Sequence, residues 1–246
     1  MKTRLSVSLG FSLIAATSTP LLAQDTQDDQ RPQLREPTRG FLLEHGYLSG
    51  SGNASVDLFT GTGDLSTGGG IRLGVPGAEV IFNADLSDSS TNEAMVKYGL
   101  PDLSVGEGGT LNWSALAGVA HIDSEDENGN TGQDFTNFLF GATATLNMDM
   151  VRLTAQPQLI FADDERDDTF FEFGLGADFV LADTEVGRFR PMVEAVITTE
   201  DDADNTIVAG VRWIYNQRLT LDVVPLYYSD DEFNSLPGAI RLNAAF

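Results

Sequence analysis

The 246-residue chain has no cysteine and only two histidines, His45 and His121. Without cysteine, a disulfide scaffold, thiol catalysis and a zinc–thiolate centre are excluded. Basic residues are also scarce, because 14 Lys and Arg face 37 Asp and Glu, which gives a formal net charge of −23 at pH 7. Nucleic acid is a polyanion, so a charge of this sign argues against nucleic acid as a partner.

Long apolar runs are missing beyond the first two dozen residues, and a spanning helix needs about 20 such residues. The N-terminus has Lys2 and Arg4, an apolar stretch over residues 5–16 and a Leu-Leu-Ala end at residue 23. This arrangement is typical of a cleaved secretory signal peptide. We therefore expect residues 1–23 to be removed on export, and any membrane role to depend on strands.

The segment 24–51 follows the signal peptide. Its first part is polar and contains two prolines and a single leucine, a composition that buries too little surface to order itself. We expect a flexible polar leader here. Residues 41–48 are more apolar and leave open two alternatives, a short plug or an extra strand.

From residue 52 to residue 246, apolar residues recur at every second position in segment after segment. Between Phe138 and Met148 the alternate residues are Phe, Phe, Ala, Ala, Leu and Met, which indicates a strand with one apolar face. Twelve strands are expected; ten or fourteen remain open, because the glycines at 68–70 weaken one of them and residues 41–48 are ambiguous. The expected strands lie at 52–59, 69–75, 78–86, 93–100, 111–122, 138–148, 151–161, 171–181, 190–197, 207–215, 219–223 and 240–246.

A soluble sandwich also alternates, but strand length and loop pattern favour a transmembrane barrel. Strands of about ten residues are long enough to cross a bilayer at a tilt, and tight turns alternate with longer polar loops. If the last strand ends at the periplasmic rim, all the long loops share the opposite rim, where they carry 20 acidic residues and one basic residue, Arg166. These loops are 85–93, 123–134, 163–168, 200–204 and 230–232.

Aromatic residues of the apolar face fall mostly near strand ends, where amphipathic rings meet the membrane interfaces. Phe82, Phe140 and Phe173 lie deeper. The rings expected near the two rims are Tyr98, Trp113, Phe189, Trp213, Tyr215 and Phe246 on the periplasmic side, and Phe138, Phe161, Phe171 and Tyr227 on the outer side.

The chain ends in Gly-Ala-Ile-Arg-Leu-Asn-Ala-Ala-Phe over residues 238–246. Together with the signal peptide and the strand-rich body, this end resembles Gram-negative outer-membrane β-barrel proteins. The resemblance implies that the barrel-assembly machinery reads Ile240, Leu242, Ala244 and Phe246. It also implies a location in the cell outer membrane, among its lipid and lipopolysaccharide. The likeness is to a class; it indicates neither a functional family nor an oligomeric state.

The polar face carries charges of both signs on adjacent strands, including Asp57 and Glu79. An unpaired charge in a narrow interior is costly, so we expect ion pairs. They fit either a solute path with a charged constriction or a filled, salt-bridged interior. The candidate lumen or constriction residues are Arg72, Lys97, Arg152, Glu172, Asp178, Arg190, Glu194, Arg212, Asp222 and Arg241.

The sequence gives little support for a catalytic site or a metal site. His121 has Asp123 and Ser124 nearby, but strand alternation does not bring three residues this close in sequence into a relay. The acidic loop 123–134 lacks the glycine and glutamate spacing of a calcium loop. We therefore expect no catalytic residue, no defined metal site and no cofactor beyond loose Ca²⁺ or Mg²⁺ at the acidic loops.

The sequence thus predicts an all-β protein, an up-and-down antiparallel transmembrane barrel of about twelve strands. The favoured function is non-enzymatic, either a porin-like narrow channel that prefers cations or a structural barrel. Two alternatives stay open. One is an outer-membrane surface hydrolase, and the other is an adhesion or ligand-binding barrel that acts through its acidic loops.

Overall fold

The computed structural model describes residues 36–61, 67–85, 90–123, 135–163, 169–200, 205–229 and 232–246. All of them belong to one compact unit, Gln33–Phe246. The elements in these ranges are strands. No helix in them is long and apolar enough to cross a membrane.

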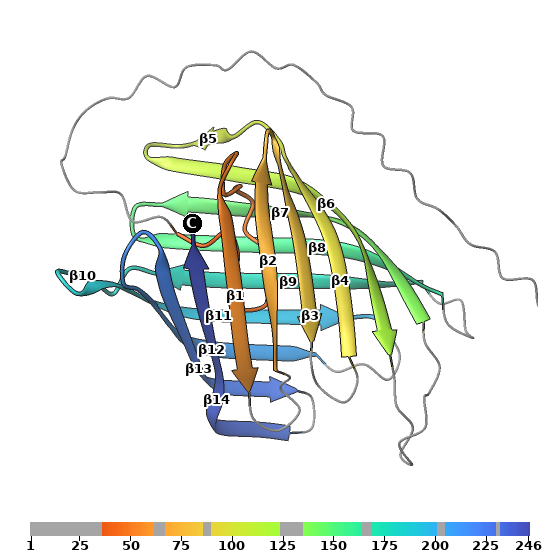
Figure 1. Cartoon of the computed structure of the whole chain (residues 1–246). Helices are drawn as coiled ribbons and strands as arrows, with labels where there is room; N and C mark the ends of the chain where they lie inside the picture. The colour runs from red at the N-terminus through yellow and green to blue at the C-terminus, as the bar shows by residue number, and fades with distance from the viewer. Residues whose placement is uncertain are drawn as a thin grey trace, which may run out of the picture. The chain divides into compact units, whose positions relative to one another are not determined.

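The strands follow one another along the chain in the order in which they pair (Figure 1). Their bounds are β1 Ala54–Gly61, β2 Gly68–Val75, β3 Ala78–Asp85, β4 Ser90–Gly99, β5 Leu103–Val105, β6 Gly109–Asp123, β7 Phe135–Met148, β8 Val151–Asp163, β9 Thr169–Phe179, β10 Ala182–Thr184, β11 Gly187–Thr198, β12 Thr206–Ile214, β13 Leu219–Ser229 and β14 Glu232–Ala245.

Antiparallel pairing closes these strands into a ring. β1 pairs with β14 from Ser55 opposite Ala245 to Gly61 opposite Ala239, and β9 pairs with β11. The ring contains twelve strands, because β5 pairs only with β6 and β10 only with β11. The predicted twelve-stranded up-and-down barrel is therefore confirmed, and the short strands β5 and β10 are additions that the sequence did not reveal.

The period-two pattern sorts side chains between the outside and the inside of the ring. Leu58 and Phe140 are more than half exposed on the outer face, whereas Arg72 and Thr143 are fully buried inside. The outer face is thus apolar and the interior polar, the reverse of a soluble barrel. This inversion is what a strand-built membrane protein requires, because its outer wall meets hydrocarbon.

The glycine-rich strand that the sequence left in doubt is β2. A Cβ at Gly70 would lie 2.4 Å from the Asn83 side-chain oxygen of β3, and one at Gly69 would lie 2.8 Å from the Asp57 carbonyl oxygen of β1. The glycines therefore let β2 pair closely with both neighbours. They leave that part of the wall without side chains.

One predicted orientation is wrong. Alternation placed Tyr227 on the outer face, but the pairing of β13 with β14 shifts register between Val224 and Leu226. Pro225 lies at the shift and has no N–H for the ladder, and Gly238 on β14 has φ +61°. The bulge reverses the alternation, so that Tyr227 is only partly exposed and packs against the interior apolar cluster.

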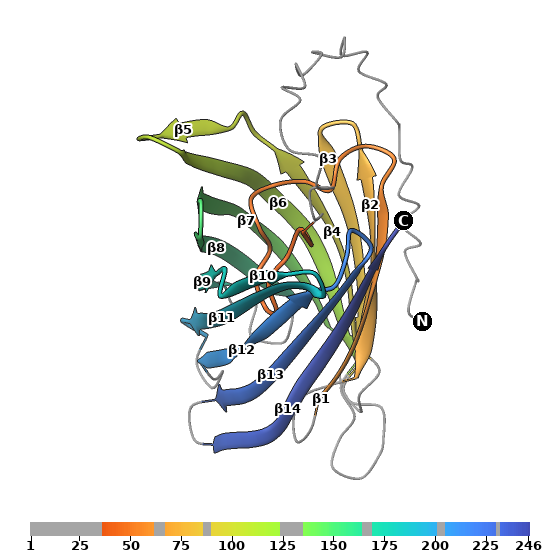
Figure 2. The same cartoon turned by 90° about the vertical axis from the view of Figure 1, so that its left-hand side faces the viewer.

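Residues 36–49, here called the inner segment, lie inside the ring, where their orange-red trace is enclosed by strands in both views (Figures 1 and 2). Their backbone forms one isolated bridge, Arg39 with Glu44. Phe41 joins an apolar cluster with Met192 and Val208 of the wall. Residues 41–48 therefore do not form the extra strand, which was one of the two alternatives left open for them.

Candidate functional site: the barrel interior

Glu44 of the inner segment is the centre of one ionic network. It accepts hydrogen bonds from Arg72 Nη2 at Oε1 (2.5 Å) and from Arg72 Nη1 at Oε2 (2.7 Å). Lys97 Nζ lies 3.2 Å from Glu44 Oε2 and 2.7 Å from Glu79 Oε2. Arg72 Nε also lies 3.3 Å from Asp57 Oδ2. Strands β1 to β4 thus hold the middle of the inner segment through paired charges.

A second network holds the beginning of the segment at the opposite wall. The carboxylate of Glu36 lies 2.6 Å from Arg152 Nη1 and 3.2 Å from Arg190 Nη1. Arg152 Nε in turn lies 2.7 Å from Asp178 Oδ2, and Arg190 Nε contacts Asp178 Oδ1. The Tyr47 hydroxyl accepts a hydrogen bond from Arg152 Nη1 (2.5 Å). Arg152 of β8 therefore contacts both ends of the inner segment, Arg190 of β11 contacts its beginning, and Asp178 of β9 pairs with both arginines.

Two further arginines bind the segment through its backbone. Arg212 pairs with Asp222 through two 2.7 Å hydrogen bonds and donates a third, of 2.8 Å, to the Arg39 carbonyl oxygen. Arg241 donates to the carbonyl oxygens of Gly40 (3.1 Å) and Phe41, and its guanidinium lies 4.5 Å from the centre of the Phe41 ring. Charge-assisted hydrogen bonds of this kind are stronger than neutral ones.

Glu194 of β11 binds three consecutive backbone N–H groups. Phe41 N donates to its Oε1 (2.8 Å), while Leu42 N (2.5 Å) and Leu43 N (3.1 Å) donate to its Oε2. A Cβ at Gly40 would lie 1.9 Å from Glu194 Oε1, so glycine is needed for this approach. The carboxylate thereby satisfies backbone donors that no strand ladder reaches.

Burial and charge set the protonation of the inner segment. Burial alone disfavours the charged form of Glu44, but Arg72 and Lys97 outweigh it and hold the pKa of Glu44 well below its ordinary value. His45 is buried, and its pKa is lowered well below the ordinary value by that burial and by the charge of Arg152. At neutral pH the segment therefore carries an ionised glutamate beside a neutral histidine.

A chamber of about 200 Å³ lies inside the barrel against the inner segment. Glu93 of β4 lines it beside Asn83 of β3, whose Nδ2 donates to Glu93 Oε2 (2.6 Å). Glu172 of β9 lines it beside Gln158, its cross-strand partner on β8. Arg39 contributes to the lining from the inner segment. The chamber is therefore polar and lined by groups of both charges.

The structure brings nearly all the predicted lumen residues into these interior networks, and nine of the ten are buried. Glu172 is the tenth, half-buried at the chamber. The buried nine are Arg72, Lys97, Arg152, Asp178, Arg190, Glu194, Arg212, Asp222 and Arg241. Their role as a constriction stays a prediction.

Sequence reasoning missed the inner segment's own contribution. Glu36, Arg39 and Glu44 supply charges to the interior. The sequence analysis placed Glu36 and Arg39 in the flexible leader, and it left the segment of Glu44 open as a short plug or an extra strand. The count of charges gave no signal for this, because the inward positions named in the sequence analysis hold six basic and six acidic residues.

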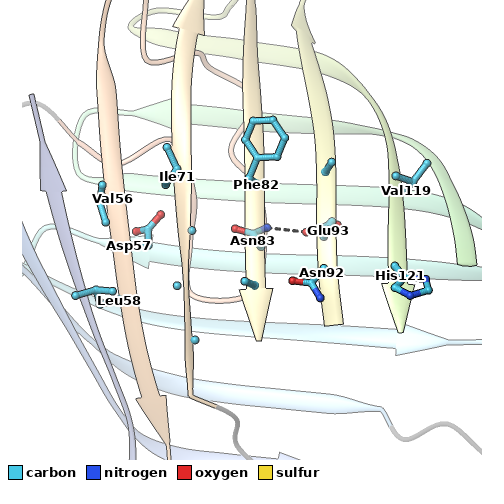
Figure 3. A pocket seen from close by; sticks show the side chains of 15 residues that line it. Val56, Asp57, Leu58, Ile71, Phe82, Asn83, Asn92, Glu93, Val119 and His121 are labelled. Atoms are coloured by element: carbon cyan, nitrogen blue, oxygen red, sulfur yellow. Dashed lines mark hydrogen bonds between the residues drawn. The ribbon is translucent and has the colours of Figure 1, made fainter. Parts of the chain in front are cut away.

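The outer wall has a hollow of about 600 Å³ over β1, β2, β3, β4 and β6. Figure 3 shows Ile71, Phe82 and Val119 around it, with Asn83 and Glu93 joined by their hydrogen bond. The glycines at 68–70 account for the missing wall side chains. Its apolar rim fits a surface that faces lipid.

Among the described residues, the contacts given for the two histidines are with threonine and tyrosine side chains. His121 is exposed at the outer hollow, with its Nδ1 3.3 Å from Thr136 Oγ1 across the strand pair. The side chain of Asp123 and all of Ser124 lie outside the described residues. His45 is stacked on Tyr47, with ring centres 5.2 Å apart, and its Nδ1 lies 3.2 Å from Thr154 Oγ1.

The acidic loops fall largely outside the described residues, so their expected Ca²⁺ or Mg²⁺ binding stays a prediction. The terminal residues are described. Ile240, Leu242 and Phe246 point outward and are exposed, and Phe246 N donates to the Ala54 carbonyl oxygen (2.8 Å). The last strand therefore closes the ring, and its recognition by the assembly machinery stays a prediction.

No family model and no curated protein sequence matches the chain. Solved structures give partial likenesses. The KdgM porin in complex with disordered oligogalacturonate has 10% identity and a TM-score of 0.49, covering 78% of this chain and 96% of that one. The NanC porin has 10% identity and a TM-score of 0.47, covering 79% and 98%. A BenF-like porin from Pseudomonas fluorescens Pf-5 has 13% identity and a TM-score of 0.37, covering 78% and 58%. The barrel assignment rests on the strand pairing of this chain.

Proposed function

We propose that this chain forms a porin-like channel in the outer membrane, with a narrow aqueous path that the inner segment restricts. One observation carries the proposal: a closed ring with an apolar outer face encloses an interior of charged and hydrogen-bonding side chains. Such an interior tolerates water, because the same groups are satisfied by hydration when the inner segment moves. A solid apolar core would not tolerate water.

The path prefers cations. Glu93 and Glu172 line the chamber without an ion pair to any described residue, whereas most interior guanidinium groups are paired with carboxylates. The chain's formal charge of −23 acts in the same direction. Fixed charge of one sign raises the local concentration of the opposite ion.

A structural barrel is the second candidate, and the inner segment favours it. The backbone of the segment is bound from one wall by Glu194 and from another by Arg212 and Arg241. A lumen held this way in every state would pass no solute. In this candidate, the barrel contributes its outer surface and loops to the envelope and transports nothing.

Reversal potentials in planar bilayers test the proposal. With a KCl gradient across the membrane, the purified mature protein is expected to give a reversal potential whose sign indicates selectivity for K⁺ over Cl⁻. The double variant Glu93→Gln with Glu172→Gln is expected to move that potential toward zero. A matched control is Glu107→Gln, an exposed carboxylate in the turn before β6. An anion-selective or nonconducting barrel would contradict the proposal.

Both candidates place the protein in the outer membrane, among its lipid and lipopolysaccharide, with assembly through the exposed terminal strand. Neither uses an active site. The described interior contains buried ion pairs where a hydrolase would need a nucleophile, a base and access for substrate. A surface hydrolase would have to work through the outer loops.

A further inference from the structure

The chamber beside the inner segment has two carboxylate–amide pairs on different walls. Asn83 and Glu93 are cross-strand partners on β3 and β4, and Gln158 and Glu172 are cross-strand partners on β8 and β9. Both carboxylates line the same chamber, Glu93 from β4 and Glu172 from β9. An ammonium group placed between them would offset their negative charge and donate hydrogen bonds to both carboxylates.

A guanidinium group faces the same chamber from the inner segment. Arg39 is only 9% exposed, and its Nε has no hydrogen-bond partner. Among the described residues its one hydrogen bond is from Nη2 to the Phe41 carbonyl oxygen (3.3 Å), and it forms no ion pair. A buried guanidinium with an unused donor is incomplete without an anionic partner.

The rest of the lining includes two further polar residues, Glu44 and Gln156, and an apolar part with Met95, Leu139 and Val196. The chamber's 200 Å³ far exceeds the roughly 15 Å³ that a single water needs. The space therefore suits a small molecule with an ammonium group, a carboxylate and a short apolar part.

We propose that the chamber binds a small zwitterion of amino-acid size, with its ammonium group between Glu93 and Glu172 and its carboxylate on Arg39. This inference rests on the proposed channel, since it names the class of solute that the channel takes. The two charged ends are recognised by different elements, the wall and the inner segment. Binding therefore requires the inner segment in its place.

Calorimetric titration of the full mature protein in detergent micelles tests the binding. The probes are L-alanine, L-alaninamide, which lacks the carboxylate, and propionate, which lacks the ammonium group. L-alanine is expected to bind at least about tenfold more tightly than either fragment, because each end adds charge-assisted hydrogen bonds. Equal binding of L-alanine and L-alaninamide, or no binding of L-alanine, would overturn the proposal.

Substitutions in the chamber test which residues bind the carboxylate and which bind the ammonium group of the zwitterion. Arg39→Gln is expected to remove the advantage of L-alanine over L-alaninamide, and Arg39→Lys to retain part of it. Glu93→Gln with Glu172→Gln is expected to remove the advantage of L-alanine over propionate. Glu107→Gln is the control with the same charge change outside the chamber. Heat-dependent gel mobility verifies that each variant is a folded barrel. An Arg39→Gln barrel that keeps the full preference would contradict the proposal.

The two proposals fail separately. Binding of L-alanine by a barrel that conducts no ions would overturn the channel and leave the chamber as a binding site. A conducting barrel that binds none of the three probes would overturn the chamber proposal and leave the channel.

Discussion

Glu44 of the inner segment and Arg72 of β2 form a two-point ion pair, with nitrogen–oxygen distances of 2.5 and 2.7 Å, inside the barrel and out of contact with bulk water. The pair joins a stretch of chain without a strand ladder to the wall. Its partner charges, Lys97 and Asp57, are equally buried. This relationship makes the position of the inner segment depend on ionisation.

Glu44→Ala is expected to destabilise the folded barrel by about 3–5 kcal/mol, because it leaves Arg72 and Lys97 buried without their shared carboxylate. The free energy of unfolding in urea, measured in micelles, checks this. Asp183→Ala is the control, since it breaks an exposed pair with Arg188 (2.8 Å) that is worth at most about 1 kcal/mol. Equal losses of unfolding free energy in the two variants would contradict the role of Glu44 as the shared buried partner of Arg72 and Lys97.

Acidification is expected to weaken the same contact. The pKa of Glu44 is lower in the folded barrel than its ordinary value of 4.5. The stabilisation is therefore complete above that ordinary value and is lost as the pH falls toward the folded value. The stability difference between wild type and Glu44→Gln should shrink from pH 7 to pH 3. A difference that grows on acidification has the wrong sign for this account.

Glu194→Gln is expected to loosen residues 41–43, because one amide oxygen replaces two acceptor oxygens and an NH₂ group then faces backbone donors. The loss is about 1.5–3 kcal/mol for a charged acceptor. Hydrogen exchange at the Phe41, Leu42 and Leu43 amides should accelerate. Glu172→Gln, an inward carboxylate that does not contact these amides, should leave the exchange unchanged. Unchanged protection in Glu194→Gln would show that other contacts hold the segment.

Gly174→Ala is expected to press on the inner segment, since the new Cβ would lie 2.4 Å from Leu43 Cδ2. Overpacking of this kind costs about 1–3 kcal/mol. Adding Leu43→Ala should recover part of the loss, which a double-mutant cycle measures as a coupling energy. Additive losses would mean that the two positions do not meet.

Phe246→Ala is expected to reduce the folded fraction in the outer membrane severalfold, because the terminal residue pairs with Ala54 at the closure of the ring and presents an exposed aromatic side chain. Heat-dependent gel mobility of membrane fractions measures this. Phe82→Ala removes another exposed aromatic residue from the outer face and should assemble normally. Equal folded fractions for the two variants would show that the terminal aromatic residue has no special role in assembly.

The barrel was predictable because alternation is a local property of the chain. Twelve strands and the buried position of Arg72, Arg152 and Arg241 follow from a period of two. The place of Glu44 does not, since a segment without strand pairing is positioned by partners more than 25 residues away in sequence. The predicted orientation of Tyr227 was wrong for a related reason. A bulge at Pro225 reverses the alternation, and periodicity alone does not locate a bulge.

Single-channel conductance in planar bilayers tests the central claim most directly. The full mature protein is compared with Glu194→Gln and with a deletion of residues 36–49, each verified as a folded barrel. The account predicts small, cation-selective steps for the wild type, larger steps for Glu194→Gln and the largest for the deletion. Silent bilayers from all three folded barrels, or equal conductance from all three, would contradict the claim that the inner segment restricts an aqueous path.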